Sequence, residues 1–302
     1  MSKAVPLSNF QIWMMAARPK TLPAAASPVI VGAAIAWHNG AFQLLPALAA
    51  LLAALLLQIG ANLANDVFDF YRGVDTAQRL GPQRVTQSGL LRPAQVMAGM
   101  GVVFGLAALL GIYLIWKAGW AVLGIGLASI LAALAYSGGP LPFGYFGLGD
   151  LAVFLFFGPV AVCGTYFIQA GTVGREAAAA SIPMGLLTTA ILVVNNLRDI
   201  ATDRATGKRT LAVRLGEAGS RWEYAVCLVL AYLAPLAMAA VKIGPWWGLL
   251  AWVSIPAGLR VWRMVSTTTG RLLNQALAGT GQLELLFGLM FGLGWVMESI
   301  LK

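Results

Sequence analysis

The sequence predicts an all-α, polytopic membrane protein with about nine transmembrane helices in a single bundle. Hydrophobic residues occupy 59% of the 302 positions and charged residues only 10%, and the mean hydropathy is +0.80. Soluble proteins carry about a quarter charged residues. The apolar residues also gather into runs long enough to cross a hydrocarbon core of ~30 Å. We therefore expect one transmembrane domain over residues 1–302, built from two half-bundles.

Nine apolar runs are expected to span the membrane, at residues 21–38, 44–66, 94–116, 119–136, 150–169, 178–197, 222–242, 245–262 and 282–300. The first run ends at His38, beside an Asn-Gly pair that is typical of a loop. The second and sixth runs each lead into a polar stretch, and the third and fourth could be divided differently. Pro159, inside the fifth run, is expected to kink its helix.

The basic residues support both the number of runs and their orientation. If the N-terminus is cytoplasmic, sixteen of the twenty Lys and Arg residues, Lys3 among them, fall on the cytoplasmic side. Only Lys117, Arg175, Lys242 and Lys302 fall on the outer side. This asymmetry agrees with the positive-inside rule. The net charge of +9 therefore needs no nucleic-acid partner to explain it.

The acidic residues gather in two clusters that follow the second and sixth runs. The clusters contain Asp66, Asp69 and Asp75, and Asp199 and Asp203. Both are expected in loops on the cytoplasmic face. Asn65 and Asp69 are four residues apart, as are Asn195 and Asp199, and residues at this spacing share a helix face. The matching pattern favours one paired site, although any single Asp could also be a solvated loop acid.

A polar stripe extends from the first cluster into the second run. Gln58, Asn62 and Asp66 follow one another at the same four-residue spacing. Exposing such a stripe to lipid is costly. We therefore expect these side chains to face the bundle interior or a central cavity that opens to the cytoplasmic side.

The clusters indicate a metal site. Carboxylates brought together from two helices repel one another unless a cation neutralises them. Mg²⁺ is a natural candidate, because it prefers oxygen ligands and is usually bound by one or two carboxylates together with substrate phosphates. Arg72 and Arg79 follow the first cluster, and Arg198, Arg204, Lys208 and Arg209 surround the second. Metal and bases together would stabilise the charge that develops on a departing diphosphate.

Two stretches resemble the aspartate-rich motifs of the UbiA superfamily of intramembrane aromatic prenyltransferases. They are NDVFDFYRGVD at 65–75 and NNLRDIATDRATGKRTLAVRLG at 195–216. RPKTLPAAASPVIVGAA at 18–34, GPQRVTQSG at 81–89 and YSGGPLPFGYFGLGD at 136–150 support the same resemblance. It implies nine helices, bound Mg²⁺-diphosphate, and a multi-pass protein of a prokaryotic inner (plasma) membrane. The N-terminus and active site would lie on the cytoplasmic side.

The resemblance also implies roles for individual residues. The first metal site would be formed by Asn65, Asp66 and Asp69, and the second by Asp199 and Asp203, with Asp69, Asp199 and Asp203 also acting in catalysis. Arg72, Arg79 and Lys208 would contact diphosphate, and Asn195 would bind substrate. Tyr136 would lie near the reacting carbon and Asp150 near the aromatic acceptor. The simpler alternatives are an interfacial aromatic for Tyr136 and a helix-capping acid for Asp150.

One departure from the superfamily pattern narrows the implied substrate. The pattern NDxxDxxxD would require an acid at Gly73, but the third acid is Asp75. The branch that acts on 1,4-dihydroxy-2-naphthoate shares this longer spacing. The resemblance therefore implies transfer of a polyprenyl group from polyprenyl diphosphate to that acceptor. Diphosphate and CO₂ would be lost, giving a demethylmenaquinol for menaquinone biosynthesis.

Two other functions remain open at this point. A member of the same superfamily could act on 4-hydroxybenzoate, homogentisate or haem. A cation-coupled transporter could also gather acids, but it would place them near mid-membrane, whereas these clusters follow the ends of runs.

Overall fold

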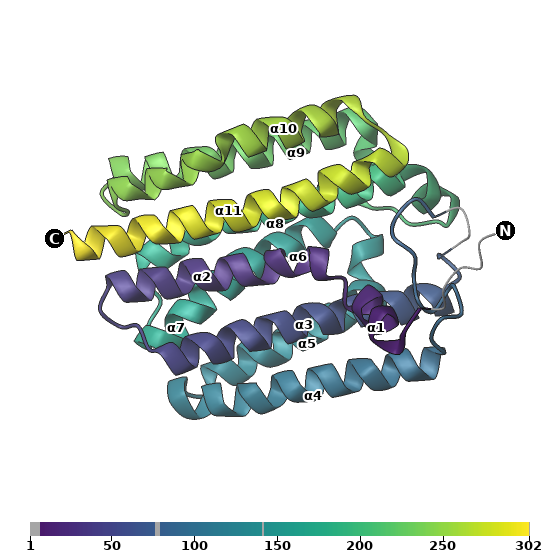
Figure 1. The fold of residues 1–302 in the computed structure, drawn as a ribbon, viewed down its shortest axis with the longest axis horizontal. Helices are drawn as coiled ribbons and strands as arrows, with labels where there is room; N and C mark the ends of the chain where they lie inside the picture. Colours follow the sequence, from purple (N-terminus) through teal and green to yellow (C-terminus); the bar gives the residue numbers. More distant parts are fainter. Residues whose placement is uncertain (1–6, 76–78, 141, 302) are drawn as a thin grey trace.

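The computed structural model describes residues 7–75, 79–140 and 142–301. Every regular element among these residues is helical (Figure 1), in agreement with the predicted fold class. Lys3 and Lys302, which the charge argument assigned to opposite sides of the membrane, lie outside the described residues.

The α-helices of the described residues are α1 (Asn9–Ala17), α2 (Leu22–His38), α3 (Leu44–Tyr71), α4 (Pro93–Ala118), α5 (Ala121–Ser137), α6 (Gly149–Leu155), α7 (Gly164–Ala170), α8 (Arg175–Ala205), α9 (Leu211–Ala240), α10 (Ile255–Thr267) and α11 (Leu273–Ile300). Short 3₁₀ turns occur at Pro19–Thr21, Phe143–Tyr145 and Gly270–Leu272, and a longer 3₁₀ helix, Trp246–Ser254, leads into α10. A π-helix, Phe156–Cys163, joins α6 to α7.

Seven helical stretches in the described part of the chain are long and apolar enough to cross a membrane. The other two expected spans are α5, with 17 residues, and the pair formed by Trp246–Ser254 and α10. The expected number of nine is therefore approximate. The kink expected at Pro159 takes the form of the π-helix, because proline has no N–H to donate to the helical ladder.

The polar stretches expected in loops are largely helical, so that part of the prediction was wrong. Helix α3 continues to Tyr71 and α8 to Ala205. Four acids therefore lie on membrane helices: Asp66, Asp69, Asp199 and Asp203. Asp66, Asp69 and Asp199 have buried hydrogen-bond partners inside the bundle, which allows these helices to continue past them. Asp75 alone of the five lies beyond its helix.

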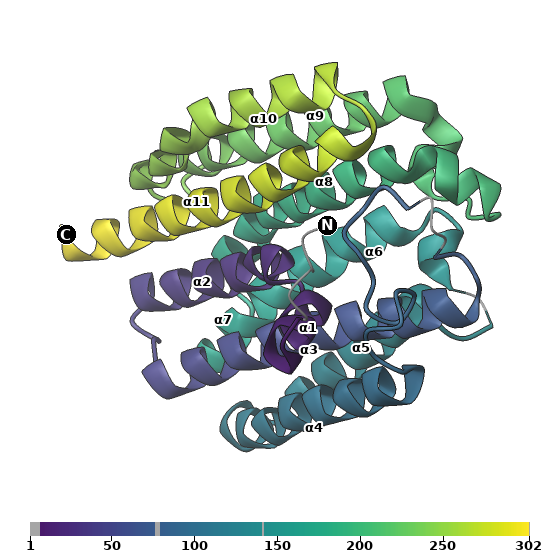
Figure 2. The same ribbon diagram turned by 45° about the vertical axis from the view of Figure 1, so that its right-hand side comes forward.

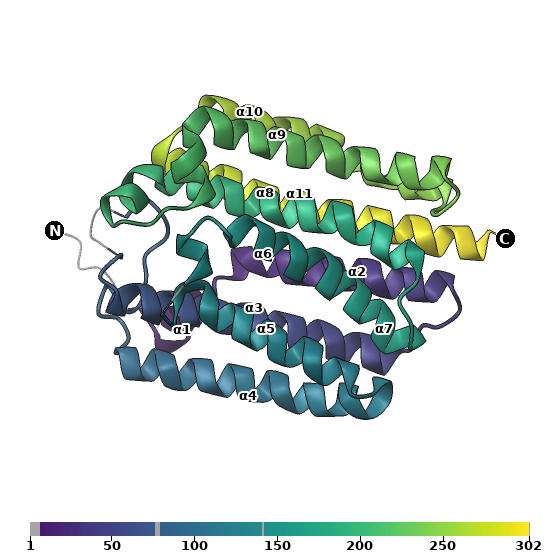
Figure 3. The ribbon, with the colours of Figure 1, turned by 180° about the vertical axis from the view of Figure 1, so that it is seen from behind.

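The long helices lie side by side along the bundle. Figures 1 and 3 show α4 along one edge and the pair α9 and α10 along the other. Helix α1 lies across α3, which Figure 2 shows most clearly. The loops that follow α3, α5 and α8 gather at one end, and α11 ends at the opposite end. This arrangement brings the two acidic clusters together.

Helices α8 and α11 form the buried centre. Leu187 of α8 and Phe287, Phe291 and Trp295 of α11 are buried. The π-helix packs tightly against α8, since a Cβ added at Gly158 would lie 2.7 Å from the carbonyl oxygen of Ser181. Glycine permits this close approach of two membrane helices. The π-helix and α8 then form adjoining parts of one cavity wall.

Candidate active site

A cavity of about 540 Å³ lies within the bundle, between α2, α3, α4, α5, the π-helix and α8. Most of its wall is apolar. One region is polar, and on the α3 side it is lined by Asn65, Asp69, Arg79 and Arg84. On the α8 side it is lined by Asn195, Asp199, Asp203 and Lys208. The cavity thus combines a charged region with space for an apolar chain.

Side chains from three other segments contact the carboxylate of Asp69. Tyr145, in the loop between α5 and α6, donates its hydroxyl hydrogen to Asp69 Oδ1 at 2.5 Å. Arg84 Nη2 donates to Oδ2 at 3.2 Å, and Lys208 Nζ lies 3.6 Å from the same oxygen. Burial, together with the adjacent Asp69 charge, raises the pKa of Tyr145, which keeps this hydroxyl protonated as a donor.

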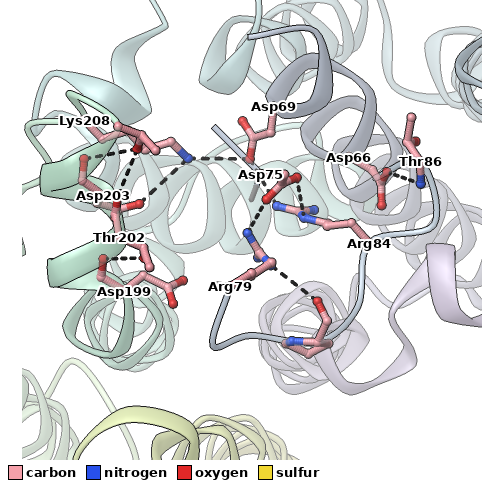
Figure 4. Close-up of polar contacts among 12 residues, drawn as sticks. Asp66, Asp69, Asp75, Arg79, Arg84, Thr86, Asp199, Thr202, Asp203 and Lys208 are labelled. Carbon is pink, nitrogen blue, oxygen red and sulfur yellow. Dashed lines mark hydrogen bonds and ion pairs between the residues drawn. The ribbon is translucent and has the colours of Figure 1, made fainter. Parts of the chain in front are cut away.

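Lys208 connects the two acidic clusters. Figure 4 shows its side chain extending between Asp203 and Asp69. Its ammonium lies 3.6 Å from Asp69 and 4.0 Å from Asp203. The same nitrogen lies 4.4 Å from the ring centroid of Tyr145, within the range of a cation–π interaction. One cation therefore neutralises a carboxylate from each cluster.

Asp199 is paired with a buried arginine. Arg198 donates from Nε and Nη2 to the two carboxylate oxygens of Asp199, at 2.8 and 2.5 Å. Arg198 Nη2 also donates to Asn195 Oδ1 at 2.9 Å, and Nη1 donates to Asn274 Oδ1 of α11 at 2.7 Å. The second cluster is thus fixed in orientation by the neighbouring helix.

Asp66 points away from the cavity. The residue is 1% exposed and does not line the cavity wall. Its two carboxylate oxygens accept hydrogen bonds from the backbone N–H groups of Val85 and Thr86, at 3.2 and 3.0 Å. Figure 4 shows the carboxylate facing this loop. Of the predicted polar stripe, Gln58 and Asn62 line the cavity and Asp66 does not.

Asp75 and two arginines form a compact group next to Asp69. Arg79 Nη1 lies 2.5 Å from Asp75 Oδ1, and Arg84 Nε lies 3.2 Å from Oδ2 (Figure 4). Burial raises the pKa of Asp75 to about 6; Arg79 opposes this rise and the Asp69 carboxylate adds to it. The two guanidinium groups therefore supply the positive charge that an ionised Asp75 needs.

Other sequence-predicted residues divide into two groups. Asn65 and Tyr136 line the cavity; Asn65 accepts a hydrogen bond from Ser137 Oγ at 2.7 Å. Arg72 and Asp150 do not line it. Arg72 is exposed and donates to the carbonyl oxygen of Gly139. Asp150 is buried in the first turn of α6, and its Oδ2 has no hydrogen-bond partner among the described residues.

The carboxylates of the site are neutralised by basic side chains. Among the described residues, no group of three or more His, Cys, Asp or Glu side chains could hold a metal ion by itself. Asp69 is paired with Arg84 and Lys208, and Asp199 with Arg198. Metal binding at this site would therefore need further oxygen ligands.

Two residues of the site, Arg84 and Tyr145, had no role in the sequence-based prediction, whereas Arg198 was predicted as one of the bases around the second cluster. Arg84 lies in GPQRVTQSG and Tyr145 in YSGGPLPFGYFGLGD, two stretches that support the family resemblance. Arg198 is adjacent to Asp199 in the sequence. The signal for Arg84 and Tyr145 was therefore present, but no spacing rule showed that both loops fold back onto Asp69.

Comparison with known proteins gives consistent matches. The model of the UbiA prenyltransferase family matches residues 25–296. A 1,4-dihydroxy-2-naphthoate octaprenyltransferase from Escherichia coli strain K12 is 42% identical over 83% of this chain and 83% of the relative. The protein of the same name from Mycobacterium tuberculosis strain H37Rv is 41% identical over 94% of this chain and 96% of the relative.

Solved structures share the fold at lower identity. A UbiA homolog from Archaeoglobus fulgidus bound to DMAPP and Mg²⁺ superposes with a TM-score of 0.66 at 16% identity, covering 94% of this chain and 99% of that one. A UbiA homolog from Aeropyrum pernix K1, in its apo form, also gives 0.66, covering 90% and 97% of the two chains.

Proposed function

The chain belongs to the UbiA prenyltransferase family, and from that premise we propose that it prenylates 1,4-dihydroxy-2-naphthoate. A polyprenyl group would pass from polyprenyl diphosphate to the ring, with loss of diphosphate and CO₂. The product would be a demethylmenaquinol, an intermediate of menaquinone biosynthesis. The relatives named for this activity cover most of the chain and match it far more closely than the archaeal homologs do.

The observation that supports the proposal best is the position of the two acidic clusters. Asp69 and Asp203 approach the same Lys208 ammonium, at 3.6 and 4.0 Å, in the polar region of an otherwise apolar cavity. A substrate with a diphosphate head and a long apolar tail has the same division of polarity. The site therefore suits the donor along its whole length.

Mg²⁺ fits the residues present when diphosphate completes its ligands. Asn65, Asp69, Asp199 and Asp203 supply the oxygen ligands that Mg²⁺ prefers, and all four line the cavity. Bound Mg²⁺ would neutralise the charge that develops on the diphosphate as it leaves. Asp66, predicted as a further ligand, instead accepts bonds from the loop backbone, so its role stays a prediction.

The basic side chains of the site would bind the diphosphate. Lys208 and Arg79 line the cavity beside the acids, and we add Arg84, which lies on Asp69 and Asp75. Arg72, outside the cavity wall, would contact the diphosphate only from its rim. These cations would stabilise the leaving group at the atoms where negative charge grows.

The apolar wall would protect the allylic cation from water, which would otherwise trap it. Tyr136 lines the cavity and packs edge-on against Phe143 at 5.5 Å between ring centroids, so its ring is held in one orientation. We propose that Tyr136 stabilises the cation through its aromatic face. Asn195 would contact the substrate directly. Asp150, which does not line the cavity, would influence the aromatic acceptor without contacting it.

We further propose a single catalytic domain with two half-bundles, each carrying one aspartate-rich motif. The match over residues 25–296 supports one domain. The protein would sit in a prokaryotic inner membrane with its N-terminus and active site on the cytoplasmic side, as the distribution of basic residues suggests. A cation-coupled transporter is not favoured, because the relatives are named as transferases.

Mass spectrometry of lipid products tests the proposal. Purified protein would receive octaprenyl diphosphate with equal amounts of 1,4-dihydroxy-2-naphthoate and 4-hydroxybenzoate, with Mg²⁺ or EDTA. We expect a decarboxylated prenyl-naphthoquinol that forms only with the metal. A prenylated hydroxybenzoate would overturn the acceptor, and the absence of any product from folded protein would overturn the reaction.

A further inference from the structure

Arg18 is held in an unusual conformation at the break between α1 and α2. Its φ of 51° and ψ of 69° lie in the left-handed region, which is rare for a residue other than glycine. Thr21 donates to the Arg18 carbonyl oxygen from its hydroxyl, at 2.9 Å. Asn62 Nδ2, on α3, donates to Ala17 O and Thr21 Oγ1, both at 3.0 Å. Helix α3 thus clamps the chain on both sides of Arg18.

One nitrogen of the Arg18 guanidinium is available to bind a ligand. Arg18 lines the cavity, and its Nη2 is buried without a hydrogen-bond partner among the described residues. The nearest carboxylate oxygen, Asp66 Oδ2, is 4.0 Å away and already accepts from the Val85 N–H. By contrast, Arg79 lies 2.5 Å from its carboxylate partner. Burying an unpaired donor is costly, so this arginine is suited to an anionic ligand.

Arg18 lies beside Asp66, the first acid of the first cluster. Figure 4 places Asp69 between Asp66 on one side and Asp199 and Asp203 on the other. Arg18 Nη2 lies 4.0 Å from Asp66 Oδ2, so its guanidinium lies beside the first cluster. The proposed function assigns the space between the two clusters to the diphosphate, with Lys208 and Arg79 around it. An anion bound at Arg18 would therefore lie next to the diphosphate, on the side of the first cluster.

We propose that Arg18 binds the carboxylate of the aromatic acceptor and gives the enzyme its preference for a carboxylated ring. This inference rests on the proposed function, since it takes the acceptor to be a hydroxynaphthoate. A guanidinium presents two parallel N–H donors that match a carboxylate. Ala24, Ala25 and Ala61 line the cavity with Arg18 and occupy little space, while Gln58 offers an amide to a ring hydroxyl.

Competitive inhibition by two analogues that lack the 4-hydroxyl group of the substrate would test the contact. 1-Hydroxy-2-naphthoate and 1-naphthol differ only in the carboxylate, so the ratio of their inhibition constants measures its recognition. In the wild type we expect the carboxylate to strengthen binding about 10- to 100-fold, as for a charge-assisted hydrogen-bonded pair. In Arg18→Gln the ratio should fall toward one.

Two further variants make the result specific. Arg18→Lys keeps the charge but loses the two parallel N–H donors of the guanidinium, so it should retain only part of the preference for the carboxylated inhibitor. Lys20→Gln removes a charge two residues away on an exposed side chain that does not line the cavity, and it should leave the ratio unchanged. The KM for octaprenyl diphosphate should stay within about twofold of the wild type in all three variants.

The inference fails if Arg18→Gln keeps the wild-type ratio. It also fails if the KM for octaprenyl diphosphate rises while the ratio stays constant, which would assign Arg18 to the diphosphate. Failure of the proposed function has a different signature: the wild type itself would give no prenylated naphthoate. If Arg18→Gln does not fold in detergent, an Arg18→Lys ratio equal to that of the wild type overturns the proposal.

Discussion

The Lys208 ammonium lies 3.6 Å from Asp69 Oδ2, which joins the loop after α8 to the last turns of α3. The two aspartate-rich stretches therefore form one electrostatic unit although they are far apart in the sequence. A lysine placed between carboxylates can turn to a phosphate once metal takes its place, because its ammonium is a point charge on a flexible stem. This relationship leads directly to the first prediction.

Replacing Lys208 with Ala should weaken donor binding. We expect the KM for polyprenyl diphosphate to rise about tenfold or more, because a charge-assisted contact is lost. The KM for 1,4-dihydroxy-2-naphthoate should change little. Arg204→Ala is the matched control, since Arg204 lies near the end of α8 but is exposed and does not line the cavity. Equal donor KM values for the two variants would contradict the assignment.

Replacing Asp69 or Asp199 with Ala should abolish turnover without unfolding the protein. Loss of a ligand that organises the leaving group should lower kcat by at least about 100-fold. Asp75 still pairs with Arg79 and Arg84 when Asp69 is absent, so the loop should stay in place. Thermal unfolding in detergent checks the fold, and Glu217→Ala, on an exposed side chain, serves as a charge control. Near-normal kcat in either variant would refute the role.

Removing divalent metal should stop the reaction reversibly. The acids of the site are paired with arginine and lysine, so the folded protein does not depend on metal for charge balance. We therefore expect EDTA to eliminate product while leaving the unfolding temperature within about 2 °C. Added Mg²⁺ should restore full turnover. Product formation that continues in EDTA would exclude a metal-dependent mechanism.

Much of the site could be predicted because residues four positions apart in the sequence lie on the same face of a helix. The steps from Asn65 to Asp69 and from Asn195 to Asp199 place each pair on one helix face, and all four residues line the cavity. The ends of α3 and α8 were harder to place. Hydropathy falls at the first acids, and only the tertiary partners of Asp66 and Asp199 show that these helices continue.

The rest of the site depends on how loops fold back, which local patterns do not determine. Arg84 and Tyr145 reach Asp69 from two different loops, and no periodicity links them. Asp66 matches the metal-binding pattern as well as Asp69 does, yet the two are only three residues apart and point to different partners. The two side chains leave the helix in different directions, so Asp69 lines the cavity whereas Asp66 binds the loop.

Replacing Asp66 with Asn should loosen the loop that carries Arg84. The carboxylate accepts two backbone hydrogen bonds from that loop. Asn keeps only one acceptor oxygen, so one bond is lost, at a cost of about 1.5–3 kcal/mol, and the other is no longer charge-assisted. We expect faster tryptic cleavage after Arg79 and Arg84, and reduced turnover. Activity should still reach half its maximum at the wild-type Mg²⁺ concentration. A raised Mg²⁺ requirement with unchanged cleavage would instead establish the metal-ligand role predicted from the sequence.

A bulky side chain at Gly126 should discriminate between donors by length. Gly126 lines the cavity on α5, and a Cβ there would meet no atom of the described residues within 4 Å. It lies ten residues before Tyr136, or about 15 Å along the helix, where only a long tail would reach.

Gly126→Trp should therefore lower kcat/KM for octaprenyl diphosphate by about tenfold or more, as a tail-sized volume is lost, and spare geranyl diphosphate. Gly124→Trp is the control, because Gly124 has the same open surroundings on the same helix but is exposed and outside the cavity wall. Equal losses for the long and short donors in Gly126→Trp would mean that the tail does not follow this wall. Since the apolar wall is the part of the site that the charged residues do not define, the comparison locates the tail independently of the diphosphate.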